Sequence, residues 1–499
     1  MKRFLIIIFI FNLIFIFSQD NSEDIAVFSD NDYLNIDIDD IINNSNEKNK
    51  TENNKKITKN DVESQITFTL SVKGGDETEF MILRNNLLND NNRFAINTFS
   101  NKTYSDIQAN INFAKIFQIY IDNSFRFIYE SNDIAHIKTD EHKNIYNKRL
   151  ENIVKEFYFL WNIPIKYPIK IVFGRTFFNP DLSFTFQTFN VFNYQKKNIG
   201  GFVDSDDVGV NMLKFSAYFP IVSFDLIYSP GIPDESDVTK MFNIQKEQKF
   251  ATKIDFNLKK VNFNINGFID TNLKWALGAN ISVNVTDEII LYSDIALKGK
   301  EKKYKITKND EKLYGDMNKY EIVSTEKMVD FSGVLLGINY TPKSVITIYG
   351  ELYFNTNGFL PDEQKNFFDN INDMNKNFHN PEYPEFLPNG KDIRTNFKYY
   401  YLGKLGESFK IYDIFNLGAF YFFTQIGKDD IAKTGIDLSL SAFIHLFDGS
   451  TMLIPKIRYN FLKYFSFEMN STLFLGYEKS LIGEVPYFGT FKILLEVRL

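Results

Sequence analysis

Histidine and serine are the residues from which a catalytic or metal site in this chain would be built. The four histidines, His136, His142, His379 and His445, are too scattered for a metal cluster, and the first two lack the i, i+4 spacing of helical ligand pairs. Ser441 lies near His445, but no nucleophile-elbow motif surrounds either residue. There is no Walker A loop and no dinucleotide fingerprint. The sequence therefore predicts no enzyme, no bound metal and no cofactor.

Cysteine content and net charge exclude further classes. The chain has no cysteine, which rules out disulfides, a thiolate metal site, a cysteine nucleophile and an acylated cysteine anchor. The formal net charge is -7 and the pI is near 5.4, so no basic excess favours nucleic acid as a partner.

The remaining chemistry lies in charged residues that occupy the polar face of alternating segments. If the apolar face contacts lipid, the polar face lines a lumen. The candidates are mixed in sign: Asp122, Arg126, Lys253, Asp255, Glu351, Asp437, Lys456, Arg458, Glu468, Lys492, Glu496 and Arg498. Neither a basic ladder nor an acidic ring stands out, so we expect weak ion selectivity. For each residue, pairing with a neighbour in a polar lumen is favoured over substrate binding.

The elements that position these charges are segments of alternating polarity, as a strand with two different faces requires. Four segments show it best, and their apolar rows are Trp275, Leu277, Ala279, Ile281, Val283 and Val285; Ile436, Leu438, Leu440, Ala442, Ile444 and Leu446; Phe465, Phe467, Met469, Leu473 and Leu475; and Phe491, Ile493, Leu495, Val497 and Leu499. Phe443 and Leu494 are exceptions to the alternation.

A soluble sandwich would also alternate, but three features favour a membrane barrel. A tilted membrane strand needs about 9 to 11 residues, and the segments are long enough for this. Aromatic residues recur near the predicted strand ends, with Trp275, Tyr421, Phe423 and Tyr459 as examples, which suggests interface girdles. A membrane helix needs about 18 apolar residues, and no stretch after the N-terminal one approaches this length.

Turns and loops give the strand count. Short connections are expected at Phe219-Pro220, at Lys259-Lys260, at Asp287 and at 341–344, and long polar loops at 230–249, 299–330 and 356–395. The connections at 269–273 and 447–451 are short, although strict alternation of short turns and long loops would place long loops there. We expect an all-β, antiparallel up-and-down barrel over residues 65–499, with about 18 strands and a range of about 16 to 20.

The N-terminal 64 residues precede this barrel. Lys2 and Arg3 are followed by an apolar run from Phe4 to Phe17, which predicts a secretory signal peptide over residues 1–18. Residues 19–64 are rich in Asn, Asp, Lys and Ser and cannot bury enough apolar surface to fold alone. They are expected to form a disordered polar periplasmic segment.

Two aromatic regions leave alternatives open. Residues 179–202 carry Phe184, Phe186, Phe189, Phe192 and Tyr194, so this segment either folds into the barrel and narrows it, or forms an outward loop or a further strand. The loop 356–395 either binds a host or matrix ligand through exposed aromatics or folds over the barrel mouth. Its aromatic residues are Phe359, Phe367, Phe368, Phe378, Tyr383 and Phe386.

Several motifs resemble porin-like and alginate-export-like barrels of Gram-negative bacteria, in which an aromatic strand precedes one that ends in Gly-Arg. Residues 156–161 (EFYFLW), 171–175 (IVFGR) and 178–181 (FNPD) carry the resemblance, with the strand pair 208–230 and the closing strands 454–499. The chain ends in Leu499 where many such barrels end in Phe or Trp. The resemblance implies an outer-membrane channel for passive diffusion of small hydrophilic solutes, in contact with outer-membrane lipid, with homo-oligomer formation left open. The alternative is a surface adhesin or antigen.

Overall fold

The computed structural model describes most of the chain beyond residue 65. The described residues are 66–84, 86–88, 96–114, 116–135, 142–178, 182, 183, 185, 186, 188, 189, 209–231, 248–299, 301–309, 320–327, 330–342, 346–379, 394–412, 414, 417–462 and 464–498. All lie in the compact unit Glu63–Leu499. The expected signal peptide and polar segment lie outside the described residues.

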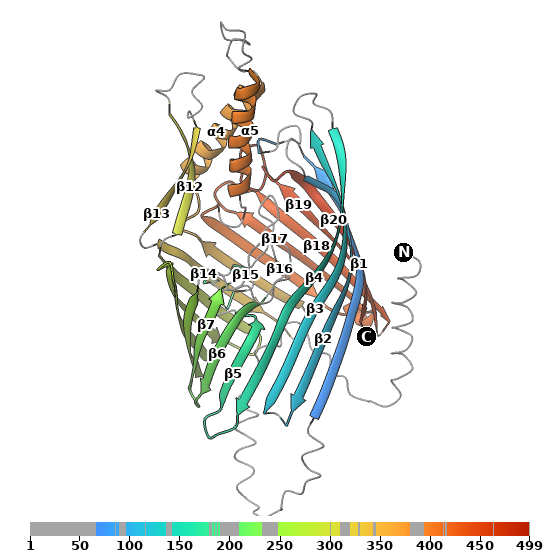
Figure 1. The fold of residues 1–499 in the computed structure, drawn as a ribbon, viewed down its shortest axis with the longest axis vertical. Helices are drawn as coiled ribbons and strands as arrows, with labels where there is room; N and C mark the ends of the chain where they lie inside the picture. Colours follow the sequence, from blue (N-terminus) through green and yellow to red (C-terminus); the bar gives the residue numbers. More distant parts are fainter. Residues whose placement is uncertain are drawn as a thin grey trace, which may run out of the picture. The chain divides into compact units, whose positions relative to one another are not determined.

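Eighteen strands form one closed antiparallel sheet (Figure 1). They are β1 (Ile66–Leu83), β2 (Ile96–Phe113), β3 (Phe117–Ala135), β4 (His142–Ile163), β5 (Ile169–Thr176), β6 (Val210–Tyr218), β7 (Val222–Gly231), β8 (Lys249–Leu258), β9 (Val261–Asp270), β10 (Trp275–Asn284), β11 (Ile289–Lys298), β14 (Asp330–Tyr340), β15 (Ile346–Phe354), β16 (Phe420–Lys428), β17 (Ile436–His445), β18 (Thr451–Leu462), β19 (Phe465–Leu475) and β20 (Tyr487–Arg498).

Each of these strands pairs with its neighbours in chain order, and β1 pairs with β20 from Lys73↔Arg498 to Leu83↔Tyr487, which closes the barrel. Closure leaves the sheet without an open edge. The predicted fold class and strand number are confirmed. Strands β1 to β4 have 18 to 22 residues each and are longer than the sequence pattern predicted.

The predicted two-faced strands are confirmed by their burial. In β10, Leu277 and Ile281 are exposed, whereas Ala276, Gly278, Asn280 and Ser282 are buried. The same alternation holds in β17, where Leu438 and Leu440 are exposed. Apolar side chains therefore cover the outside of the barrel, and polar side chains occupy many of the inward positions.

Successive connections lie alternately at the two ends of the barrel, and the long connections all lie at the same end. The β9–β10 turn (271–274) and the β17–β18 turn (446–450) lie at the same end as the long connections and are simply short. The apparent conflict in the predicted loop pattern disappears, because an outer connection need not be long.

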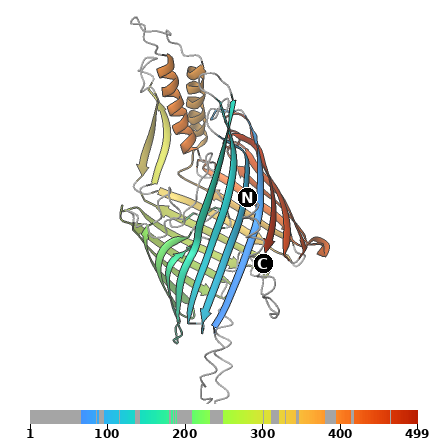
Figure 2. The same ribbon diagram turned by 45° about the vertical axis from the view of Figure 1, so that its right-hand side comes forward.

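Two hairpins extend from the long-loop end of the barrel (Figures 1 and 2). One pairs β12 (Glu301–Lys308) with β13 (Tyr320–Lys327), and the other contains helices α4 (Pro361–His379) and α5 (Arg394–Ile411). We call these two hairpins the cap. The sequence analysis predicted a polar loop here, although α4 begins with Pro361, carries Asp362 and Glu363 in its first turn and ends with basic residues, as helices favour. A short 3-10 turn, η3 (Ile431–Lys433), lies between β16 and β17.

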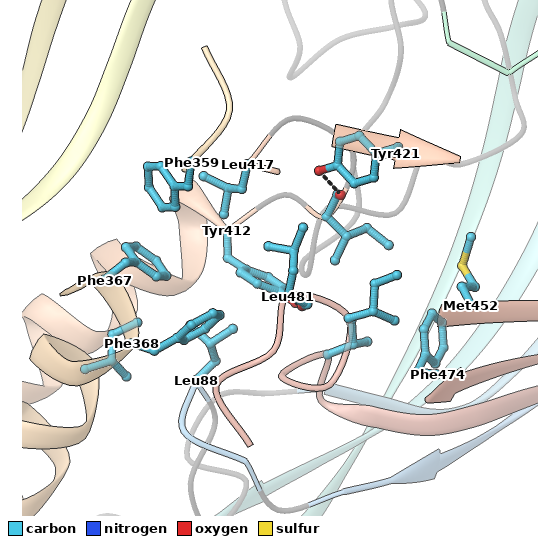
Figure 3. Close-up of a cluster of buried hydrophobic side chains, with 14 of the residues drawn as sticks. Leu88, Phe359, Phe367, Phe368, Tyr412, Leu417, Tyr421, Met452, Phe474 and Leu481 are labelled. Carbon is cyan, nitrogen blue, oxygen red and sulfur yellow. Dashed lines mark hydrogen bonds between the residues drawn. The ribbon is translucent and has the colours of Figure 1, made fainter. Parts of the chain in front are cut away.

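A large apolar core joins the cap to the inner wall of the barrel (Figure 3). Phe367, Phe368 and Ile371 of α4 belong to it, together with inward-facing Tyr421 and Phe443. The prediction that Tyr421 and Phe423 form an interface girdle is wrong, because Ile426 of β16 is exposed and places the odd positions inside. Phe443 breaks the polar inner row of β17 because it packs in this core.

No helix in the described part of the chain is long and apolar enough to cross a membrane.

Candidate channel lumen

All twelve predicted lumen residues lie on the inward faces of their strands. In β3, Phe125 and Phe127 are exposed, so Asp122 and Arg126 face inward and are buried. In β18 and β20, exposed Ile457 and Leu495 likewise place the even-numbered candidates inside. The remaining candidates, on β8, β15, β17 and β19, each lie on the face opposite to the exposed apolar residues of their own strand. Strand alternation alone predicted the face on which they lie, and their role as pore-lining residues stays a prediction.

Glu496 is the centre of the densest charge cluster. Its carboxylate lies 2.8 Å from Lys73 Nζ, 3.1 Å from Arg458 Nη2 and 2.6 Å from Arg498 Nε. Tyr104 also donates a hydrogen bond of 3.1 Å to it. The sequence analysis missed Lys73 and Tyr104, because their approach to Glu496 depends on the closure of β1 on β20.

Most other lumen charges are paired across neighbouring positions. Ion pairs of 2.9 Å join Lys456 to Glu468, Lys492 to Glu77 and Lys253 to Asp255. The remaining candidates form hydrogen bonds: Asp122 accepts from Gln108, Arg126 donates to Ser124, and Asp437 accepts from Asn460. The inner wall therefore has a mixed, largely compensated charge.

The two sides of the lumen differ in packing. Along β1, β18 and β20 the charged side chains keep contact with solvent, and Lys73, Lys456 and Arg498 are 36%, 41% and 49% exposed. Along β11 and β14 to β17 the inward side chains are buried in the apolar core, as with Leu335 and Tyr421. The charged side is therefore the more solvent-accessible side of the inner wall.

The described residues of the aromatic segment, 182, 183, 185, 186, 188 and 189, fold into the barrel. Its backbone N–H groups donate to two buried carboxylates: Thr185 to Glu351 at 2.9 Å, and Leu182 and Ser183 to Asp294 at 3.2 and 3.0 Å. Tyr292 donates a further bond of 2.6 Å to Glu351. The two buried carboxylates, Asp294 and Glu351, thus accept hydrogen bonds from the segment, and these bonds attach the segment to the wall.

Aromatic packing completes the attachment of this segment. Phe186 stacks on Tyr353 with ring centroids 4.6 Å apart and also contacts Phe443. Phe189 is buried in a second apolar cluster against the wall around Met212. The prediction that this segment folds into the barrel is confirmed for these residues, while Phe184, Phe192 and Tyr194 lie outside the described part.

The aromatic residues of the loop 356–395 face the barrel interior rather than solvent. Phe359, Phe367, Phe368 and Phe378 are at most 5% exposed. The expectation of exposed aromatics for a host or matrix ligand is therefore wrong for them, and the alternative that this loop folds over the mouth is correct. Tyr383 and Phe386 lie outside the described residues.

Polar contacts also attach the cap to the barrel mouth. Gln364 of α4 donates to Asp448 at 2.7 Å, Asn375 donates to the Leu87 carbonyl at 2.6 Å, and Lys479 pairs with Asp369 at 2.7 Å. Within the cap, Lys303 of β12 pairs with Glu363 at 2.6 Å.

Two carboxylates organise the mouth beneath the cap. Burial alone would raise the pKa of Asp448, but contacts with His445 and Ser450 outweigh it and hold the pKa below its ordinary value. Burial raises the pKa of Glu484, against the N–H groups of Lys479 and Leu87 that donate to it. His445 Nδ1 lies 3.0 Å from Asp448, so this histidine is a structural partner in the β17–β18 turn.

No group of three or more metal-ligating side chains occurs among the residues that the structure describes. Ser441 and His445 share the inward face of β17, but they lie four residues apart on an extended strand, about 13 Å at ~3.3 Å per residue, which is beyond hydrogen-bond reach.

Comparison with known proteins gives solved barrels of similar size. No protein-family model matches the sequence, and no curated protein matches it. Among solved structures, Pseudomonas aeruginosa OccK7 (OpdD) is 7% identical, with 87% of this chain and 98% of that chain covered and a TM-score of 0.46. Acinetobacter baumannii OccAB1 is 9% identical, with 87% and 96% covered and a TM-score of 0.45. Pseudomonas aeruginosa OpdQ is 7% identical, with 87% and 98% covered and a TM-score of 0.45.

Proposed function

We propose that this protein is a porin-like channel of the bacterial outer membrane, through which small hydrophilic solutes diffuse passively with weak selectivity. The observation that carries the proposal is the closed 18-stranded barrel with an apolar outside and a charged, solvent-accessible inner wall.

The outside of the barrel supports the membrane location. A membrane-spanning structure must satisfy every backbone polar group internally, which a closed barrel does. Exposed Leu277, Leu336 and Leu440 would each be poorly hydrated in water but contact acyl chains in a bilayer. Stacked Phe117 and Trp161 lie at the short-turn end of β3 and β4, where an aromatic girdle is expected.

The inner wall supports weak selectivity and the absence of a dedicated binding site. Lumen charges of both signs neutralise one another, so neither cations nor anions meet a ring of one sign. The segment 182–189 narrows the lumen from one side, and the cap covers part of the mouth.

Single-channel recording tests the proposal. The full mature protein, refolded and inserted into planar bilayers, is expected to give stable conductance steps. A variant lacking residues 360–417 is expected to give larger steps, because it removes the helical hairpin of the cap; Phe359 and Gly418 already form a β-bridge that brings the cut ends together. The exposed-helix variant Lys365→Ala is the control and should conduct like the parent.

The contrary result is equally clear. If heat-modifiable barrels insert but conduct neither with nor without residues 360–417, the channel proposal fails. If both conduct equally, the helical hairpin of the cap does not restrict the pore.

A further inference from the structure

A groove crosses the apolar outside of the barrel over β16 to β20, which lie side by side in the wall (Figure 1). We call it the wall groove, and its volume is about 640 Å³. Ile426, Leu440 and Ile457 border it, and all three are exposed residues of the outward rows of their strands. The wall groove therefore opens on the outside of the barrel and not on the lumen.

A proline and a short side chain lie between the larger apolar residues of the wall groove. Pro455 has no backbone N–H, and the pairing of β18 with β19 is interrupted at residues 454 and 455. Ser471 lies opposite this point on β19, and its hydroxyl donates to the Thr490 carbonyl at 3.0 Å. Because this hydroxyl is already bonded within the wall, the groove presents an apolar surface to an occupant.

One outward-facing cation borders the wall groove. Lys428 is the last residue of β16, at the short-turn end, and its partners on both adjoining strands are apolar. No carboxylate of the described residues forms an ion pair with it, although Asp429 and Asp430 follow in the turn; Asp430 accepts from the N–H of Gly435 at 2.9 Å. Lys456 also borders the groove, but its side chain faces the lumen.

The strand register makes the wall groove rise from Lys428 into the apolar belt. Lys428 pairs with Leu438 of β17, which pairs with Ile457 of β18. In turn, Ile457 pairs with Met469 of β19, so the four residues form one row across four strands. Lys428 ends its strand, whereas Ile457 and Met469 lie well inside theirs. An occupant of the groove therefore has one end beside a cation at the short-turn rim and the rest among apolar side chains.

We infer that the wall groove binds an anionic glycerophospholipid, with its phosphate on Lys428 and an acyl chain in the groove. This inference rests on the proposed membrane location. The acyl chain matches the apolar surface, and the phosphate at the rim supplies the negative charge that the described residues do not provide to Lys428. A neutral lipid would use the groove without the cation, and a free phosphate the cation without the groove.

Native mass spectrometry of the full mature protein, refolded in a nonionic detergent, tests the site with dioleoyl phosphatidylglycerol as the probe. Dioleoyl phosphatidylcholine has the same chains and a headgroup without net charge, and it is the reference lipid. We expect the parent to bind one phosphatidylglycerol about 5-fold more tightly than phosphatidylcholine. Glycerol phosphate, which has the anion without the chains, should not displace it.

Two variants remove the two features of the site separately. Lys428→Gln should weaken phosphatidylglycerol binding about 5-fold and leave phosphatidylcholine binding unchanged, and its matched control is Lys260→Gln in the exposed β8–β9 turn at the same end. Ser471→Phe fills the groove and should weaken the binding of both lipids about 5-fold or more, because the acyl chain loses its contacts. Its control is Ser293→Phe on the outward face of β11. Heat-modifiable migration confirms that each variant has folded.

The site would be overturned if the folded parent retained no lipid, bound both lipids equally or released phosphatidylglycerol to glycerol phosphate. Equal losses in Lys428→Gln and Lys260→Gln, or in Ser471→Phe and Ser293→Phe, would also contradict it. Conductance of the same samples separates the two ideas. Channels without selective lipid binding would remove this inference alone, whereas barrels that bind the lipid selectively and never conduct would remove the channel function and leave the site.

Discussion

At the scale of single residues, Glu351 shows how a buried charge shapes the lumen. Its side chain is fully buried in β15, yet its two oxygens accept from Tyr292 and from the backbone of Thr185 in the infolded segment. A hydrogen bond to a charged group stabilises by about 1.5 to 3 kcal/mol. Glu351 therefore holds the segment that folds into the barrel.

The substitution Glu351→Gln should loosen this segment, because the amide keeps the size of the side chain but loses its charge and one acceptor. We expect larger conductance steps with more open-channel noise in planar bilayers. Asp287→Asn, in the exposed β10–β11 turn, is the control. A Glu351→Gln channel indistinguishable from the parent would show that residues 182–189 do not limit the flow.

At the scale of elements, the cap depends on apolar packing more than on its ion pairs. Phe368 of α4 is fully buried, whereas the side chains of Lys479 and Asp369 are 35% and 42% exposed. Removing a buried Phe side chain costs about 3 to 5 kcal/mol. An exposed ion pair contributes about 0 to 1 kcal/mol.

A single thiol on the buried face of α4 measures this difference. Met374→Cys is buried in the apolar core and reacts with a maleimide only when the cap opens. Adding Phe368→Ala should raise the labelling rate by about 100-fold or more, since 1.4 kcal/mol corresponds to a factor of ten. Adding Lys479→Ala should raise it less than about 5-fold. Rates are compared with exposed Lys365→Cys, and the reverse order would show that ion pairs hold the cap.

At the scale of the whole molecule, barrel closure sets the charge balance of the lumen. Glu496 of β20 faces Lys73 of β1, Arg458 of β18 and Arg498, so three cations share one carboxylate. The balance there depends on Glu496 more than on any single cation.

Substitutions in this cluster should therefore shift ion selectivity in opposite directions. Glu496→Gln leaves three cations uncompensated and should raise the chloride-to-potassium permeability ratio about twofold or more. Arg458→Gln should lower that ratio by a smaller factor. Reversal potentials under a KCl gradient measure both, and Asp287→Asn should leave the ratio unchanged. If neither variant moves the reversal potential, the conducting path does not pass this cluster.

Local pattern was sufficient for the strands and for the side on which each lumen residue lies. A strand repeats every two residues, so the alternation around Leu277 or Leu438 assigns each side chain to a face without knowledge of its neighbours. The strand number followed from counting such segments between turns.

Local pattern was misleading where the inside of the barrel is not polar. Tyr421 and Phe423 were predicted to form an interface girdle, and Phe443 was treated as an exception to the alternation. All three instead belong to the apolar core with Phe186 and the cap, which come from distant parts of the chain. The helices of the cap were missed because residues 356–395 were interpreted as one long polar loop.

The sequence by itself therefore determined the barrel, its two faces and the face on which each charged side chain lies, because period-two alternation is a property of each strand alone. Only the tertiary structure decided that Lys73 pairs with Glu496, that Thr185 and Leu182 donate to Glu351 and Asp294, and that the cap packs against the barrel mouth. Those contacts join residues separated by tens to hundreds of positions, and their formation depends on sheet closure and loop packing rather than on any local repeat.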